Sequence, residues 1–63
     1  MKYIKYKSHG QTKYGKVLET FHSREKLECI RVKTEGEIVL FFSKESLTKV
    51  SEEEYLTGII LQS

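Results

Sequence analysis

The length of this chain and its cysteine content constrain its fold most: 63 residues hold a single cysteine, Cys29. A chain this short buries only about 60% of the surface that its unfolded form exposes, so it holds one small core and no cleft between large domains. One cysteine cannot form an internal disulfide, the common way to stabilise small secreted domains. We therefore expect a protein of a reducing compartment, the cytoplasm.

Apolar residues occur only in short runs. None of these runs approaches the roughly 20 residues that a membrane-spanning helix needs. No signal-peptide hydrophobic region follows the first lysines. The sequence therefore predicts a soluble chain with no membrane association.

The two ends of the sequence carry opposite charge. Residues 1–18 contain five lysines and no acid, whereas residues 51–63 contain three glutamates and no base. Without that acidic tail, the remaining residues hold eleven bases and six acids, a net charge of +5. Lysines interleaved with tyrosines are typical of a nucleic-acid-binding surface. Alternatively, the lysines are the solvent-facing half of alternating strands and discourage aggregation.

The first half of the sequence has the pattern of a β-hairpin. Residues 2–7 alternate, with Ile4 and Tyr6 on one face and lysines and Tyr3 on the other, which predicts a strand. Residues 8–11 supply a turn in which Gly10 adopts a positive φ. Residues 13–22 form a second strand, and the adjacent apolar pair at 17–18 predicts a bulge or bend there.

Residues 27–33 and 37–42 predict a second hairpin, which has two possible registers. A three-residue loop at 34–36 pairs Val32 with Ile38 and places Lys33 opposite Glu37. A two-residue loop at 35–36 shifts the pairing by one residue. The opposite charges favour the three-residue loop, and a slip of one residue exchanges the two faces of a strand. Val39 and Phe41 then share a face with the basic residues of the preceding strand.

The remaining segments predict a short turn, a last strand and a helix. Residues 43–47 suit a single 3₁₀ turn, and residues 48–50 a short strand. Ser51 and Glu54 have the spacing of a capping box, in which each side chain bonds the backbone N–H of the other residue. We therefore expect a mainly β fold. A small five-stranded SH3-like barrel spans residues 1–50, and a short capped C-terminal helix over residues 51–63 packs on the barrel or on a partner.

Three segments resemble small SH3-like barrels of the KOW, Tudor and chromatin-protein type. They are residues 14–19 (YGKVLE), the hairpin tip 35–37 (EGE) and residues 47–50 (LTKV). Such folds commonly show a Gly-x-Val strand, an acidic-glycine hairpin tip and a closing Leu-x-x-Val. The lysine-rich start and the terminal helix are similar to small archaeal DNA-coating barrels. This resemblance implies a non-catalytic binding module.

The sequence offers no pattern of residues for catalysis. His9, His22 and Cys29 lack the spacing of a metal site, which usually needs four ligands when structural. Helix capping accounts for the consecutive glutamates 52–54, and the four glycines stand too far apart for a phosphate loop. We expect no enzymatic activity, catalytic residue, metal, cofactor or small-molecule substrate. Cys29 is interpreted as a packing residue beside Phe41.

The outer face of the sheet is the predicted binding surface. Nucleic acid, either DNA or RNA, is the leading partner, with cations on the phosphates and aromatic rings stacking on bases. The alternative is a protein partner, as for an inhibitory accessory protein of a phage or mobile element, or self-association into a homo-oligomer. A further alternative is that the terminal helix covers Val39 and Phe41 as a second small core. The predicted binding residues are Tyr3, Lys5, Lys7, Tyr14, Lys16, Arg31, Lys33, Val39 and Phe41.

Overall fold

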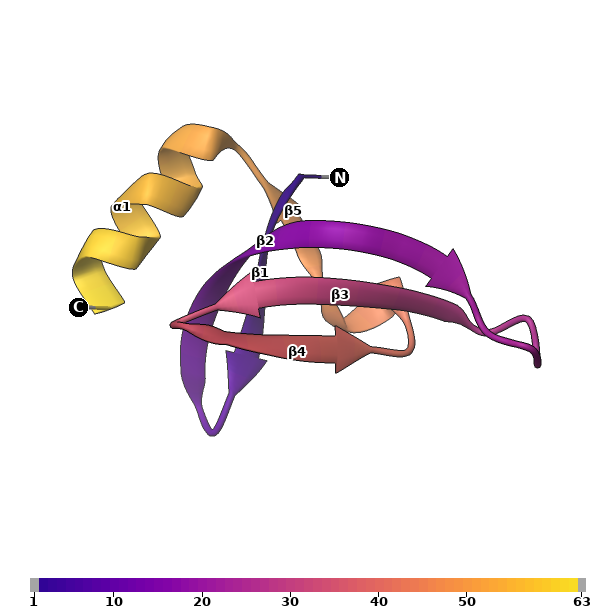
Figure 1. Cartoon of the computed structure of the whole chain (residues 1–63). Coiled ribbons are helices and arrows are strands. Elements are labelled where there is room, and N and C mark those ends of the chain that lie inside the picture. The colour runs from indigo at the N-terminus through magenta and orange to yellow at the C-terminus, as the bar shows by residue number, and fades with distance from the viewer. Residues whose placement is uncertain (1, 63) are drawn as a thin grey trace.

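A five-stranded antiparallel sheet and one C-terminal helix make up this protein, as the sequence predicted (Figure 1). The computed structural model describes residues 2–62, so residues 1 and 63, at the ends of the two predicted ranges, lie outside it. The strand order is β4-β3-β2-β1-β5. In chain order the elements are β1 (Tyr3–Ser8), β2 (Gln11–His22), β3 (Glu28–Thr34), β4 (Glu37–Phe41), the 3₁₀ helix η1 (Lys44–Ser46), β5 (Thr48–Val50) and α1 (Glu52–Gln62).

The sheet is bent but not closed, so the closed barrel that the sequence predicted over residues 1–50 is not confirmed. The long strand β2 pairs with β1 through residues 11–16 and with β3 through residues 16–22, so it belongs to both halves of the sheet. β4 and β5 are the two edges, and within residues 2–62 they do not pair with each other. The predicted short last strand and 3₁₀ turn are confirmed. Among the described residues, the one α-helix has 11 residues, too few to cross a membrane.

The bend in β2 has two local causes. The register with β3 shifts between Val17 and Glu19, which confirms the predicted bulge and makes Leu18 the extra residue. Gly15 is buried, and a Cβ at this position would collide with the side chain of Val32 and lie 3.1 Å from the Lys33 carbonyl oxygen. Glycine at position 15 therefore lets β2 approach β3 closely.

Both hairpins close with two-residue turns. The predicted turn at 8–11 is confirmed, with positive φ at His9 (53°) and Gly10 (79°). The second hairpin has the same geometry at Glu35 (47°) and Gly36 (82°). Positive φ at both central residues is typical of the type I′ turn, whose twist matches that of the flanking strands.

The predicted register of the second hairpin is wrong. Thr34 pairs with Glu37, Val32 with Val39, and Ile30 with Phe41, so the loop has two residues and not three. Thr34 therefore belongs to β3, where its buried hydroxyl donates a hydrogen bond of 2.8 Å to the Tyr14 carbonyl oxygen. The register prediction failed because residues 38–42 are all apolar, so that either register aligns aliphatic side chains.

The apolar core lies on one side of the sheet, which we call the inner face. Ile4, Ile30, Val32 and Leu47 form the buried cluster, and Tyr6, Val17 and Phe41 pack against it half-buried. Leu47 follows η1 and belongs to this cluster, so the segment between β4 and β5 covers the core on the inner face of the sheet. The opposite side, the outer face, holds the alternate residues of the strands: Tyr3, Lys5, Lys7, Tyr14, Lys16, Arg31, Lys33, Ile38 and Leu40.

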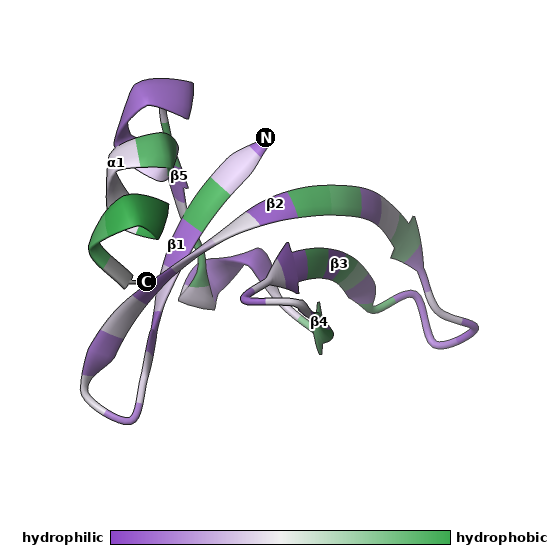
Figure 2. Ribbon diagram, turned by 60° about the vertical axis from the view of Figure 1, so that its left-hand side comes forward, coloured by the Kyte–Doolittle hydropathy of each residue, from purple (hydrophilic) through white to green (hydrophobic). Residues whose placement is uncertain are grey.

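The helix begins as the capping pattern predicted. The Ser51 hydroxyl accepts a hydrogen bond of 3.1 Å from the Glu54 N–H, which satisfies one of the free donors of the first turn. The Glu54 carboxylate is bonded to Lys5 of β1, 3.1 Å away, and not to the Ser51 backbone as a full capping box requires. α1 packs on β1 and β2, and its exposed side carries apolar residues in its later turns (Figure 2).

Candidate functional site

The outer face has two parts, and the helix covers one of them. Over β1 and β2, the rings of Tyr3 and Tyr55 stack with centroids 4.5 Å apart and planes at 30°. One turn further along the helix, a Cβ at Gly58 would collide with the Tyr14 ring, so only glycine lets α1 lie directly on that ring. Two aromatic residues of the predicted binding surface are therefore packed within the protein.

The first lysine on this covered part also has an intramolecular partner. Lys5 forms an ion pair with Glu54, and each side chain keeps about two fifths of its surface exposed (38% and 43%). Such a pair contributes at most about 1 kcal/mol, because solvent screens it. It nevertheless places a carboxylate beside a cation that was expected to contact phosphate.

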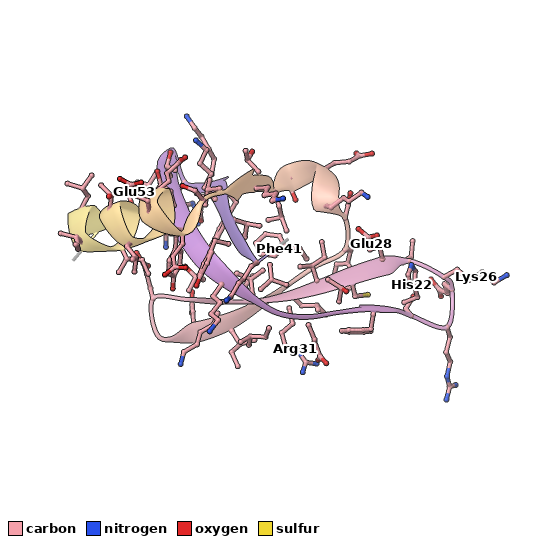
Figure 3. All side chains as sticks on the ribbon, turned by 90° about the horizontal axis from the view of Figure 1, so that it is seen from above. His22, Lys26, Glu28, Arg31, Phe41 and Glu53 are labelled. Carbon is pink, nitrogen blue, oxygen red and sulfur yellow. The ribbon has the colours of Figure 1, made fainter. Side chains whose placement is uncertain are left out.

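Val39 and Phe41 do not lie on the outer face. The corrected register turns both side chains to the inner face, where the Phe41 ring meets the Tyr6 ring edge-on at 5.0 Å. Figure 3 shows Phe41 inside the bent sheet and Arg31 pointing away from it. Because α1 packs on β1 and β2, the alternative in which the helix covers Val39 and Phe41 is also wrong.

Arg31 and Cys29 have neighbours within the sheet. The Arg31 Nη1 atom lies 2.6 Å from the Glu19 carboxylate, and its guanidinium lies 5.8 Å from the Phe21 ring centroid. Cys29 is buried, as a packing residue would be, but it faces Phe21 of β2 and not Phe41. Its thiol donates a weak hydrogen bond to the Leu27 carbonyl oxygen at 3.6 Å.

The uncovered part of the outer face, over β3 and β4, exposes apolar side chains beside Arg31 and Lys33. Ile38 is 61% exposed, Leu40 is 40% exposed, and Phe42, which follows β4, is 63% exposed. These residues are absent from the predicted site, because the wrong register assigned Ile38 and Leu40 to the core. The five consecutive apolar residues 38–42 were the available signal, since a strand with one buried face needs only every second residue to be apolar.

A groove separates the helix from this uncovered part, and we call it the outer groove. Its volume is about 510 Å³. In Figure 1 the tip of the β3–β4 hairpin points toward the C-terminal half of α1. Residues of both the hairpin tip and the helix line the groove. The helix supplies apolar wall residues, the two central strands supply the floor, and the hairpin tip closes one end. The lining residues are Lys16, Leu18, Lys33, Glu35, Gly36, Tyr55 and Ile59.

Two lysines of the groove face each other. Lys16 of β2 and Lys33 of β3 are directly paired in the register, and neither has an ion-pair partner within residues 2–62. Like charges directly opposite on two strands destabilise a sheet. An anion bound between them would relieve that repulsion. The predicted site residues Lys16 and Lys33 are thus brought together, next to Leu18, which was not among the predicted site residues.

The single acid of the groove already has a partner. Glu35 accepts a hydrogen bond of 3.1 Å from Lys13 Nζ. This hydrogen bond and the charge of Glu35 raise the pKa of Lys13 above its ordinary value of 10.5. The carboxylate is therefore directed to the first hairpin and leaves Lys16 and Lys33 without a counter-charge.

A smaller hollow of about 390 Å³ lies where β1 meets β5 and η1. Lys5, Lys7 and Thr48 contribute to its lining. Lys7 is exposed and lacks an ion-pair partner among the described residues, whereas Lys5 is held by Glu54. The hollow thus offers one cation without a protein counter-charge, against two in the outer groove.

The described residues contain no cluster of three or more histidine, cysteine, aspartate or glutamate side chains arranged to hold a metal. The lysines and the apolar walls of the outer groove suit contact with a ligand through charge and apolar surface. Comparison with known proteins adds no relative: no family model, no curated protein and no solved structure matches this chain.

Proposed function

We propose that this chain is a non-catalytic protein-binding module of the SH3-like barrel class, and that its outer groove holds a partner segment in which a carboxylate lies among apolar side chains. The observation that carries the proposal is the Lys16–Lys33 pair, which faces the groove without a counter-charge. The strand order and the 3₁₀ helix between β4 and β5 support the SH3-like class.

The walls of the groove favour a protein segment over nucleic acid. Leu18 is 44% exposed and Ile59 is 36% exposed, and both line the groove beside the lysines. Apolar walls gain free energy by burying apolar side chains, at about 25 cal/mol for each Å² removed from water. A phosphate backbone would gain little from these walls, and beyond the groove it would meet the acidic first turn of α1.

A peptide selection tests this proposal. A library of extended peptides is panned on the immobilised protein, and the selected peptides are then measured against wild type and lysine-to-glutamine variants. We expect the selected peptides to carry aspartate or glutamate between apolar residues. Lys16→Gln or Lys33→Gln should weaken binding about tenfold, which corresponds to about 1.4 kcal/mol for a charge-assisted contact.

The matched control is Lys49→Gln. Lys49 is an exposed lysine of β5 that lies outside the groove and has no ion-pair partner among the described residues. Its replacement removes the same charge and should leave peptide affinity unchanged. Equal binding by wild type and a Lys16→Gln/Lys33→Gln double variant would refute the proposed groove.

Nucleic-acid binding is the second candidate, and the exposed Lys7, Lys16 and Lys33 of the outer face support it. None of the three has an ion-pair partner within residues 2–62. With about three phosphates neutralised, log K should fall against log salt with a slope of about −2.7 on duplex DNA. Each lysine-to-glutamine change should reduce that slope by about one. Absence of binding to duplex DNA and single-stranded RNA at about 100 µM protein in low salt excludes this candidate.

A further inference from the structure

Beyond its first residue, Glu37, the edge strand β4 lacks the charged side chains, prolines and bulges by which proteins protect a sheet edge. Within residues 2–62, β4 pairs only with β3, and Figure 1 shows it along the border of the sheet. Natural edges carry lysine, proline or a bulge, which hinder pairing with another chain. Residues 38–42 are Ile-Val-Leu-Phe-Phe and contain none of these.

The backbone of β4 presents its free hydrogen-bonding groups at the same residues whose side chains are exposed. The two-residue turn makes Thr34 and Glu37 a hydrogen-bonded pair. Paired positions alternate along an antiparallel ladder, so Ile38 and Leu40 turn their N–H and C=O groups away from β3. These are the residues that are 61% and 40% exposed on the outer face.

We propose that two copies of this chain pair through β4, antiparallel and about a two-fold axis at Leu40. The second copy is the occupant that fits, because the edge is complementary to itself. This register places the two Leu40 residues opposite each other and Ile38 beside Phe42 of the second copy. No like charges meet along the pairing.

The charges at the two ends of β4 support this register. Glu37 begins the strand and Lys44 follows its end, and both are exposed and without an ion-pair partner among the described residues. In an antiparallel pair centred on Leu40, Glu37 of each copy lies opposite Ser43 of the other copy, one residue before Lys44 at the start of η1. Each end of the pairing therefore carries one acid and one base, and neither end gathers like charges.

The interface is expected to be weak. One strand from each copy and three exposed apolar side chains bury less than the roughly 800 Å² per partner of a standard stable complex. We therefore expect a reversible dimer with a dissociation constant in the micromolar range. The paired edges would form one sheet of ten strands with an outer groove in each half.

Sedimentation velocity over protein concentrations from about 5 µM to about 1 mM tests the dimer. The average mass should rise from monomer to dimer in wild type and stay monomeric in Leu40→Lys. The control Leu56→Lys adds the same charge at a leucine of α1 that is 51% exposed, and it should dimerise as wild type does. Far-UV circular dichroism checks that each variant is folded.

Cross-linking tests the register separately. A Leu40→Cys variant should form a disulfide dimer under mild oxidation, because residues directly opposite on antiparallel strands have Cα atoms about 4.5–5.5 Å apart, within disulfide range. A Leu56→Cys variant should not, and the buried Cys29 can stay in place. A constant monomer mass, or a dimer that Leu40→Lys leaves intact, would overturn the proposal. Peptide binding in the outer groove is measured independently, so failure of one proposal does not imply failure of the other.

Discussion

The two parts of the outer face differ in what covers them. Over β1 and β2, the helix stacks Tyr55 on Tyr3, places Gly58 on Tyr14 and pairs Glu54 with Lys5. Over β3 and β4, the apolar side chains at 38, 40 and 42 remain exposed. The aromatic residues that made the first part resemble a binding surface are the ones that hold the helix. The part over β3 and β4, which the helix does not cover, remains open to a partner.

The largest expected effect is on the free energy of unfolding, and it differs between two residues of the outer face. Tyr3 lies on the part that the helix covers, and Ile38 lies on the uncovered part. Tyr3→Ala should lower the free energy of unfolding by about 2 kcal/mol, because it removes a half-buried ring and its stacking on Tyr55. Ile38→Ala should cost less than about 0.5 kcal/mol, because Ile38 is mostly exposed. Urea denaturation at low micromolar protein concentration measures both. Equal losses in the free energy of unfolding would show that the helix does not stabilise one part of the outer face more than the other.

A smaller effect tests the contact between the helix and Tyr14. Gly58→Ala should lower the free energy of unfolding by about 1 kcal/mol, since overpacking against the ring outweighs the gain of about 1 kcal/mol in helix propensity. The control Thr57→Ala, at the exposed neighbouring position, should be neutral or slightly stabilising. Thermal unfolding followed at 222 nm compares them. A Gly58→Ala variant more stable than wild type would contradict this packing.

The smallest effect concerns the ion pair that joins the two hairpins, Lys13–Glu35. Because Glu35 raises the pKa of Lys13, the pair stabilises the folded state fully below about pH 10.5, and this contribution is lost as pH rises through the higher folded-state pKa. Glu35→Gln should return the pKa of Lys13 toward 10.5, as measured by NMR titration of its side-chain ¹³Cε signal. Glu19→Gln removes a carboxylate bonded to Arg31 and should leave Lys13 unchanged. A Lys13 titration that does not respond to Glu35→Gln would show that the pair does not form in solution.

Local patterns predicted the elements well, because each rests on near neighbours in the chain. Alternation around Ile4 and Tyr6 identified β1, Gly10 identified its turn, and Ser51 identified the start of α1. The bulge followed from two adjacent apolar residues, Val17 and Leu18. Within the candidate site, the sequence selected Lys16 and Lys33 on one face. It could not select Tyr55 or Ile59, since their place beside those lysines depends on where the helix packs.

The sequence by itself determined a small β fold without a disulfide, an acidic capped helix and a basic face on β1 and β2. Only the tertiary structure decided the register of β4 and the position of α1. Five consecutive apolar residues carry no alternation, so the twist of a two-residue turn fixed the register and sent Phe41 to the core. A short helix with apolar residues around much of its circumference has no single preferred face for packing. Gly58, which has no side chain, allows the helix backbone to pack directly on the Tyr14 ring.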